Sequence, residues 1–141
     1  MRPKSLMAGS PAQIAASLLA LLPAPVSARE DYYRDATRRA IAVVLTALRA
    51  SGKHAVTSFD PVAELLLSGD ALVALERELP AGGARSALVL FLDEYRTRMA
   101  NGEVRLRQDL LEHSFGAVLG QLRTRLSEGS TNRAVNGAAH A

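Results

Sequence analysis

The longest uninterrupted helical pattern in this chain runs from Arg29 to Gly52, and it limits what the rest of the chain can fold into. At helical spacing, small and apolar side chains fall on one broad face and charged side chains on the other. The buried face is expected to hold Tyr33, Ala36, Ala40, Val43, Val44, Ala47 and Leu48, with Ile41 beside them. The solvent-exposed face is expected to hold Arg34, Asp35, Arg38, Arg39, Thr46 and Arg49. Ser27 and Glu30 form a capping-box pattern before this stretch, and Gly52 can end it in the left-handed conformation. A helix of about 30 Å, at roughly 1.5 Å per residue, spans a small domain, so other helices can pack along it.

Composition favours helix in the rest of the chain as well. The chain has 141 residues, of which 48% are apolar and only 4% aromatic, and it lacks both Trp and Cys. Its core must therefore be built from Leu, Ala and Val, and the excess of Ala and Leu over β-branched residues favours helices. The absence of Cys excludes disulfides and thiolate metal sites. A net charge of +3 is too small to predict nucleic-acid binding by itself.

Five further segments have helical periodicity and end at Gly or Pro signals. They run from Pro11 to Leu22, from Asp60 to about Ser68, from Asp70 (as N-cap) to Leu79, from Ala84 to Ala100, and from Val104 or Arg105 to Leu126. Their inward faces are expected to include Ile14, Leu18, Leu21 and Leu22, then Val62, Leu65 and Leu66, then Leu72, Leu75 and Leu79, then Leu88, Phe91, Leu92, Tyr95 and Met99, and finally Leu106, Leu110, Leu111, Phe115, Val118, Leu119 and Leu122. No alternating stretch is long enough to predict a strand. The sequence thus predicts an all-α fold, a compact bundle of about six helices of unequal length in residues 1–128, followed by a disordered tail at 129–141.

The first of these segments has a second interpretation. Basic residues Arg2 and Lys4, the apolar run 14–22 and the ending Val26-Ser27-Ala28 are typical of a secretory signal peptide. However, Pro11 interrupts the start of the apolar run, and 10–13 read as a capped helix start, with Ser at the N-cap and Gln three residues later. We favour a permanent helix, and the alternative of a signal peptide at 1–28 stays open. The run is too short for a stable transmembrane helix.

No catalytic, cofactor or metal-binding pattern emerges. His54, His113 and His140 are far apart in the sequence, and no HExxH motif is present. A phosphate-binding loop would require Ser or Thr after Gly52-Lys53, where this chain has His54. No nucleophile elbow surrounds any serine. We therefore expect a protein that is not an enzyme and that binds no cofactor or metal.

The remaining polar signal is a group of arginines. Arg96, Arg98, Arg105 and Arg107 flank the turn predicted at Asn101-Gly102. Arginines bind carboxylate and phosphate groups well, so these four are candidate partner-binding residues. The interpretation that we favour is an ordinary solvated surface, because Asp93, Glu94, Glu103 and Asp109 are interleaved with them, and partner binding stays open as the second interpretation. Tyr32 can be interpreted in two ways, as a packing residue or as a partner contact. We favour packing.

The order of the helical motifs resembles a known family. The segments GSPAQIAASLLALLP (9–23), DYYRDATRRAIAVVLTAL (31–48), PVAELLLSGDALVALERELP (61–80) and ALVLFLDEYR (87–96) are similar to the all-alpha domain of type IV coupling proteins. These are hexameric, membrane-anchored ATPases of conjugation and type IV secretion, in which this domain is inserted into the nucleotide-binding domain. The resemblance covers most of residues 9–127 and consists of helix-packing patterns. Neither Walker motif nor a transmembrane segment accompanies it here.

The resemblance implies a role in substrate recognition. The domain would lie on the cytoplasmic face of the bacterial inner membrane, as part of the longer ATPase, and would dock relaxosome components or secreted effectors, with a possible contact to DNA. Alone, it would be monomeric and would not insert into the membrane. Two other classes stay open, namely a small basic DNA-binding helical module, which the high pI permits, and a secreted periplasmic helical protein, if 1–28 is a signal peptide.

Overall fold

The computed structural model describes the backbone of residues 7–52 and 56–140, and the side chains of 7–52 and 56–128. In chain order its elements are the helices α2 (Pro11–Leu19), α3 (Ala28–Ser51), α4 (Asp60–Leu66), α5 (Gly69–Glu78) and α6 (Gly83–Asp93), the strands β1 (Arg96–Arg98) and β2 (Val104–Leu106), and the helix α7 (Gln108–His140). Helices make up most of the described chain, and the one sheet within it has two strands. The predicted all-α bundle of about six helices is confirmed.

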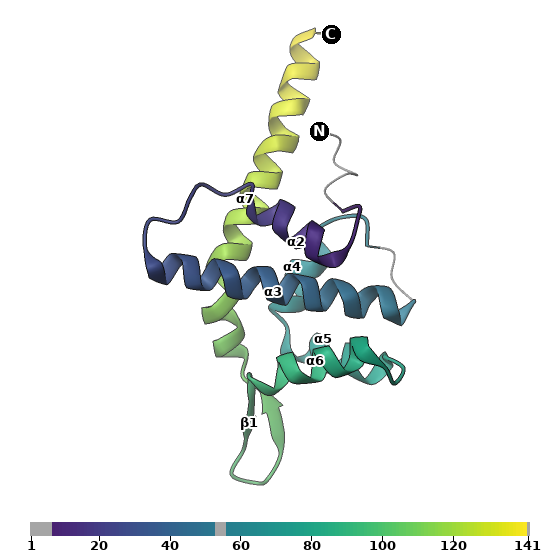
Figure 1. Cartoon of the computed structure of the whole chain (residues 1–141). Coiled ribbons are helices and arrows are strands. Elements are labelled where there is room, and N and C mark those ends of the chain that lie inside the picture. The colour runs from purple at the N-terminus through teal and green to yellow at the C-terminus, as the bar shows by residue number, and fades with distance from the viewer. Residues whose placement is uncertain (1–6, 53–55, 141) are drawn as a thin grey trace.

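Helix α3 is the centre of the fold, as predicted, because α2, α4, α5, α6 and α7 all pack against it (Figure 1). Its ends lie where the sequence places them. The Ser27 hydroxyl accepts a hydrogen bond from the Glu30 amide at 3.1 Å, and Gly52 adopts a left-handed φ of 67°. The Glu30 carboxylate accepts from the Val26 amide, one residue before the cap, instead of completing the predicted capping box.

The prediction of the solvent-exposed face of α3 is wrong at one position, since Arg34 is buried. Its guanidinium donates to the backbone carbonyl of Pro23 and to the Glu30 carboxylate, the latter at 2.5 Å. A buried cation needs paired acceptors of this kind. Helical periodicity assigned Arg34 to solvent because it could not show that the preceding loop folds back over this part of the helix.

Helix α2 packs against α3 through its inward face, so the N-terminal apolar run is part of the core. Ser10 and Gln13 form the reciprocal capping box that the sequence predicts. Ile14, Ala15 and Leu18 are fully buried. The helix ends at Leu19, three residues earlier than predicted, and the following turn leaves Leu21 and Leu22 half-buried.

The corner between α4 and α5 is held by the start of α7. Ser68, and not Asp70 as predicted, is the N-cap of α5, and its hydroxyl accepts from the Ala71 amide at 3.2 Å. The Gln108 side chain spans the corner, accepting from the Gly69 amide at 3.0 Å and donating to the Leu67 carbonyl. The short helices are therefore connected to a residue some forty positions later in the chain.

The region 94–107 differs most from the prediction, since it forms a β-hairpin where two helix ends were expected. Helix α6 ends at Asp93 instead of Ala100, and α7 begins at Gln108 instead of Val104 or Arg105. The turn at Asn101-Gly102 was predicted correctly, and Asn-Gly is a strong hairpin signal. With three residues in each strand, the alternation is too short to be recognised in the sequence.

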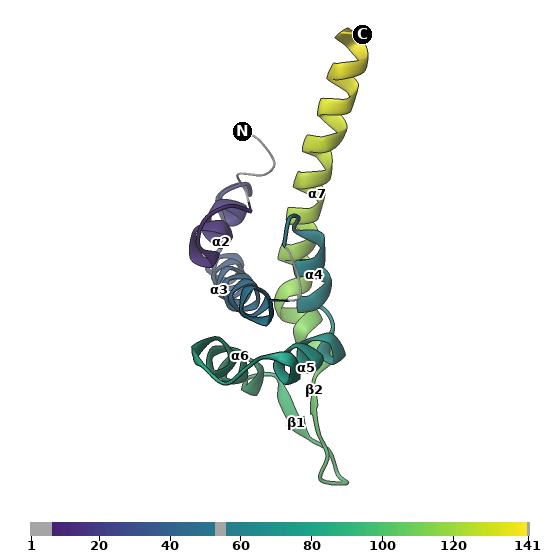
Figure 2. The same ribbon diagram turned by 90° about the vertical axis from the view of Figure 1, so that its right-hand side faces the viewer.

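The helices form two layers. Helices α2, α3 and α6 lie on one side and α4, α5 and α7 on the other (Figure 2). Helix α7 crosses α3, and its last turns extend past the rest of the domain at the end opposite the hairpin (Figure 1). The predicted disordered tail, 129–141, lies outside the residues whose side chains are described, and the backbone of α7 continues to His140. Within the described ranges, no helix is both long and apolar enough to cross a bilayer.

Candidate functional site

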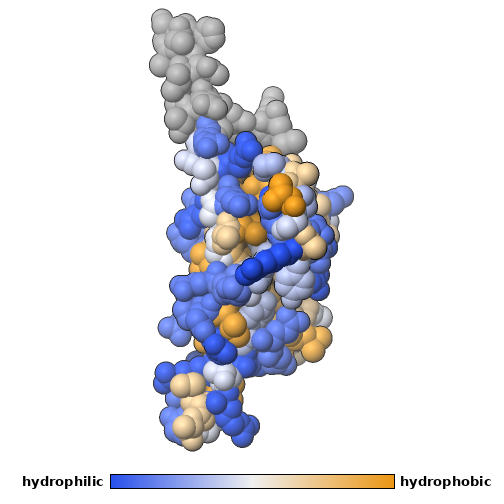
Figure 3. Space-filling view, turned by 90° about the vertical axis from the view of Figure 1, so that its left-hand side faces the viewer, coloured by the Kyte–Doolittle hydropathy of each residue, from blue (hydrophilic) through white to orange (hydrophobic). Residues whose placement is uncertain are grey.

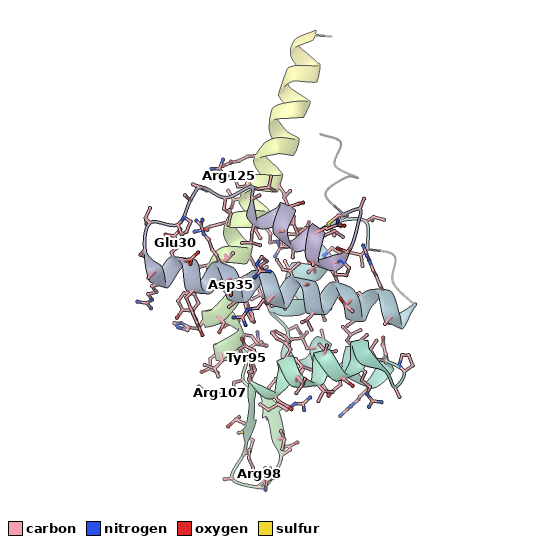
Figure 4. The ribbon with its side chains drawn as sticks, viewed as in Figure 1. Glu30, Asp35, Tyr95, Arg98, Arg107 and Arg125 are labelled. Atoms are coloured by element: carbon pink, nitrogen blue, oxygen red, sulfur yellow. The ribbon has the colours of Figure 1, made fainter. Side chains whose placement is uncertain are left out.

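The β1–β2 hairpin projects from the helical body and brings the predicted arginines to one end of the molecule (Figures 1 and 4). Its loop is Ala100, Asn101 and Gly102, closed by a bond from the Met99 amide to the Glu103 carbonyl at 2.7 Å. Gly102 has a φ of 85°, which favours glycine, and the Asn101 side chain accepts from the Glu103 amide at 3.0 Å. This is the three-residue hairpin loop in which a left-handed residue completes the turn.

The strand register decides which side chains share a face. Arg96 is opposite Leu106, Thr97 opposite Arg105 and Arg98 opposite Val104. Side chains alternate along a strand and opposed residues point the same way. One face therefore carries Arg96, Arg98, Val104 and Leu106, and the other carries Thr97 and Arg105. The four predicted arginines do not form a single cluster.

The base of the hairpin is fixed to the body. Arg96 donates to the Glu76 carboxylate of α5 at 2.6 Å and to Asp93 at 2.7 Å. The side chains of Arg96 and Glu76 are only 25% and 18% exposed, so this ion pair is partly buried. The Tyr95 ring packs against those of Phe91 and Phe115, which also contact each other.

The outer part of the hairpin presents a cation beside apolar side chains. Arg98 is exposed and, among the described residues, makes no ion pair. Met99 and Val104 are 41% and 53% exposed, which makes them two of the few large apolar residues on the described surface. Figure 3 shows hydrophobic and hydrophilic residues side by side on this projecting end. Met99 was predicted to be buried, which is wrong because the chain leaves the helix six residues before it.

Two of the predicted arginines are paired with carboxylates near them in the sequence. Arg105 contacts Glu103 at 2.9 Å, and Arg107 contacts Asp109 at 2.6 Å. The hydrogen bond from Arg107 lowers the pKa of Asp109 below its ordinary value and raises the pKa of Arg107. Of the four candidates, Arg96 therefore has a structural role, Arg105 and Arg107 are partly neutralised, and Arg98 has the cation most available to a partner.

An aromatic group lies near the junction of α3 with α7. The Tyr33 hydroxyl is 3.0 Å from the His113 Nε2, and the Tyr32 ring meets the edge of Tyr33 with their centroids 5.4 Å apart. Tyr32 thus packs against Tyr33 as favoured, but it is 65% exposed, so packing accounts for only part of its surface. His113 is exposed, and its contact with Tyr33, eighty positions earlier, has no signal in the sequence.

The described residues contain no group of three or more His, Cys, Asp or Glu side chains placed to hold a metal ion. Of the three histidines, His113 alone has a described side chain, because His54 lies outside the described residues and the side chain of His140 is not described. In the described part of the chain, the β1–β2 hairpin is the candidate site.

The comparisons with known proteins returned no relatives. No family model, no curated protein and no solved structure matches this chain.

Proposed function

We propose that this chain is a substrate-recognition domain that binds a protein partner through its projecting hairpin. This is the role implied by its resemblance to the all-alpha domain of type IV coupling proteins, where the partner would be a relaxosome component or a secreted effector. The observation that carries the proposal is the combination at the outer part of the hairpin, where Arg98, which has no ion pair within the described chain, lies beside the exposed Met99 and Val104.

The chemistry of this surface suits a protein partner. Arg and Met are enriched in protein interfaces, and apolar groups at the centre of a contact supply most of its binding energy. Val104 is directly opposite Arg98 and shares its face of the hairpin, whereas Met99 follows Arg98 and lies on the other face of the same tip. A partner segment that combines a carboxylate with an apolar residue would match this surface.

The ion pairing of the other arginines favours a protein over DNA. Phosphate binding requires several free cations along one surface, and affinity rises with the number of phosphates neutralised. Arg96, Arg105 and Arg107 already contact carboxylates, and so does Arg123 on α7, which pairs with Asp60 at 3.2 Å. A DNA-binding role would leave most of these cations competing with their own acidic neighbours.

The test is binding of candidate partners to the isolated domain and to two charge-reversal variants. Arg98→Glu should weaken binding of a relaxosome protein or effector tail by about tenfold or more, because a like charge replaces the attractive one. Arg125→Glu is the matched control, since Arg125 is also exposed but lies on α7, far from the hairpin (Figure 4). Arg96 is left unchanged because its loss would disturb the fold.

Equal affinities for the two variants would refute the hairpin as the docking site. If the domain instead binds duplex DNA with an affinity that falls steeply with salt, and Arg98→Glu and Arg125→Glu weaken it equally, the DNA-binding class replaces the proposal.

A further inference from the structure

The hairpin has unused backbone hydrogen-bonding groups, and the ladder shows which residues carry them. The Met99 amide bonds to the Glu103 carbonyl, and the Arg107 amide to the Tyr95 carbonyl at 2.8 Å. In an antiparallel pair, hydrogen-bonded and non-hydrogen-bonded residues alternate. The N–H and C=O groups of Thr97 therefore point into the ladder, whereas those of Arg96 and Arg98 on β1, and of Val104 and Leu106 on β2, point outward.

Both outer edges lack a further strand in the described chain, but they differ in their surroundings. Strand β2 packs against α5, and Leu106 lies so close to Gly69 that a Cβ there would be 3.2 Å from the leucine Cβ. Strand β1 ends at the exposed Arg98, away from the body (Figure 4). An unpaired edge is a template for another extended chain.

The charge on β1 selects what can pair with it. A second copy of this chain that added its own β1 in antiparallel orientation would place Arg98 opposite Arg98 or Arg96. Like charges directly opposite each other destabilise a sheet. A strand with Asp or Glu opposite Arg98 would gain an attractive cross-strand pair, because side chains opposite each other lie on the same face.

We propose that the outer edge of β1 binds an extended acidic segment of the partner as a third strand, with a carboxylate beside Arg98 and an apolar side chain near Met99. This inference rests on the proposed function, in which the hairpin is the docking site, and it specifies the form of the ligand. The segment exchanges backbone hydrogen bonds with Arg98 and Arg96, whose amides and carbonyls face it.

The test separates backbone pairing from side-chain charge by using two substitutions at one position. Arg98→Gln removes the charge alone, whereas Arg98→Pro also removes the outward N–H without removing a bond inside the hairpin. The matched pair on the other edge is Val104→Ala and Val104→Pro, which both remove the exposed valine side chain, whereas only the second removes an outward N–H. The probe is a short fluorescent peptide in which Glu alternates with Val, together with a counterpart that has Lys at each Glu position.

We expect the acidic peptide to bind, the Lys counterpart to bind at least tenfold more weakly, and the amide of Arg98 to exchange its hydrogen more slowly in the complex. Arg98→Gln should weaken binding by about threefold, as for an exposed ion pair. Arg98→Pro should weaken it by roughly tenfold or more, as one backbone hydrogen bond is also lost. Val104→Pro should bind like Val104→Ala, because the outward N–H of β2 takes no part in strand addition to β1.

Equal affinities for Arg98→Gln and Arg98→Pro would overturn strand addition. Weaker binding of Val104→Pro than of Val104→Ala would overturn the assignment to β1. If the acidic peptide fails to bind while a protein partner still binds and is weakened by Arg98→Glu, the strand model is wrong and the proposed function stands. If Arg98→Glu has no effect on that partner either, both are wrong.

Discussion

Replacing Leu18 with Ala tests whether the N-terminal apolar run is a structural helix. Leu18 is 1% exposed and faces α3 one turn after Ile14, which is buried to the same extent. The change removes three carbons, each worth about 0.8 kcal/mol on burial, or about 2.4 kcal/mol in all. The cavity left behind adds roughly 1 kcal/mol, so the free energy of unfolding should fall by about 3 kcal/mol. That is a large share of the 5–15 kcal/mol typical of a domain.

Urea denaturation followed by circular dichroism would measure this loss, which should lower the midpoint without changing the slope. Ser17→Ala is the control, because Ser17 is exposed on the same helix and should change stability by less than about 0.5 kcal/mol. A loss below about 1 kcal/mol for Leu18→Ala would refute the packing of α2 on α3. It would also favour the signal-peptide alternative, which mass spectrometry of the mature protein would then decide.

Three further predictions concern the charged side chains. Glu76→Gln weakens the partly buried ion pair with Arg96, so it should destabilise the domain by about 1–2 kcal/mol. The same change should shift the amide NMR resonances of the hairpin, and unchanged resonances would contradict this prediction. Arg34→Ala should lower the free energy of unfolding, measured by thermal unfolding, by about 1–3 kcal/mol. It should also expose the loop before α3 to proteolysis, since the Arg34 guanidinium donates to the Pro23 carbonyl in that loop. Cleavage of the loop no faster than in the unchanged protein would be evidence against this. The pKa of Asp109, lowered from 3.8 by Arg107, should rise towards 3.8 in Arg107→Gln when followed by NMR. Because the folded-state pKa is the lower one, the stabilisation from Asp109 is present above the ordinary value and is lost as the pH falls through the folded pKa.

The helical part of the fold was predictable because local signals mark it. Ser10, Ser27 and Gly52 cap helices by interactions within a few residues, and the sequence contains both partners of each interaction. The apolar periodicity of α3 is long enough to identify its core face. These features depend on neighbouring residues, and so reading along the chain recovers them.

The candidate site was predictable only in part, because its geometry depends on distant residues. The arginines near Asn101-Gly102 were recognised, but helical periodicity could not distinguish Arg96, which pairs with Glu76 of α5, from Arg98, which has no such pair. The exposure of Met99 follows from the early end of α6. These outcomes are set by packing between elements, which residue spacing alone does not show.

The anchoring at the base of the hairpin bears on how a ligand would be received. Arg107 is the only residue between β2 and α7, and Gln108, the first residue of that helix, is hydrogen-bonded to the α4–α5 corner. A loop held at its root in this way is already ordered before any encounter, so little conformational entropy remains to be lost when a ligand arrives. Modest contacts at a small tip can then suffice for selective capture, and association need not wait for a rearrangement of the domain.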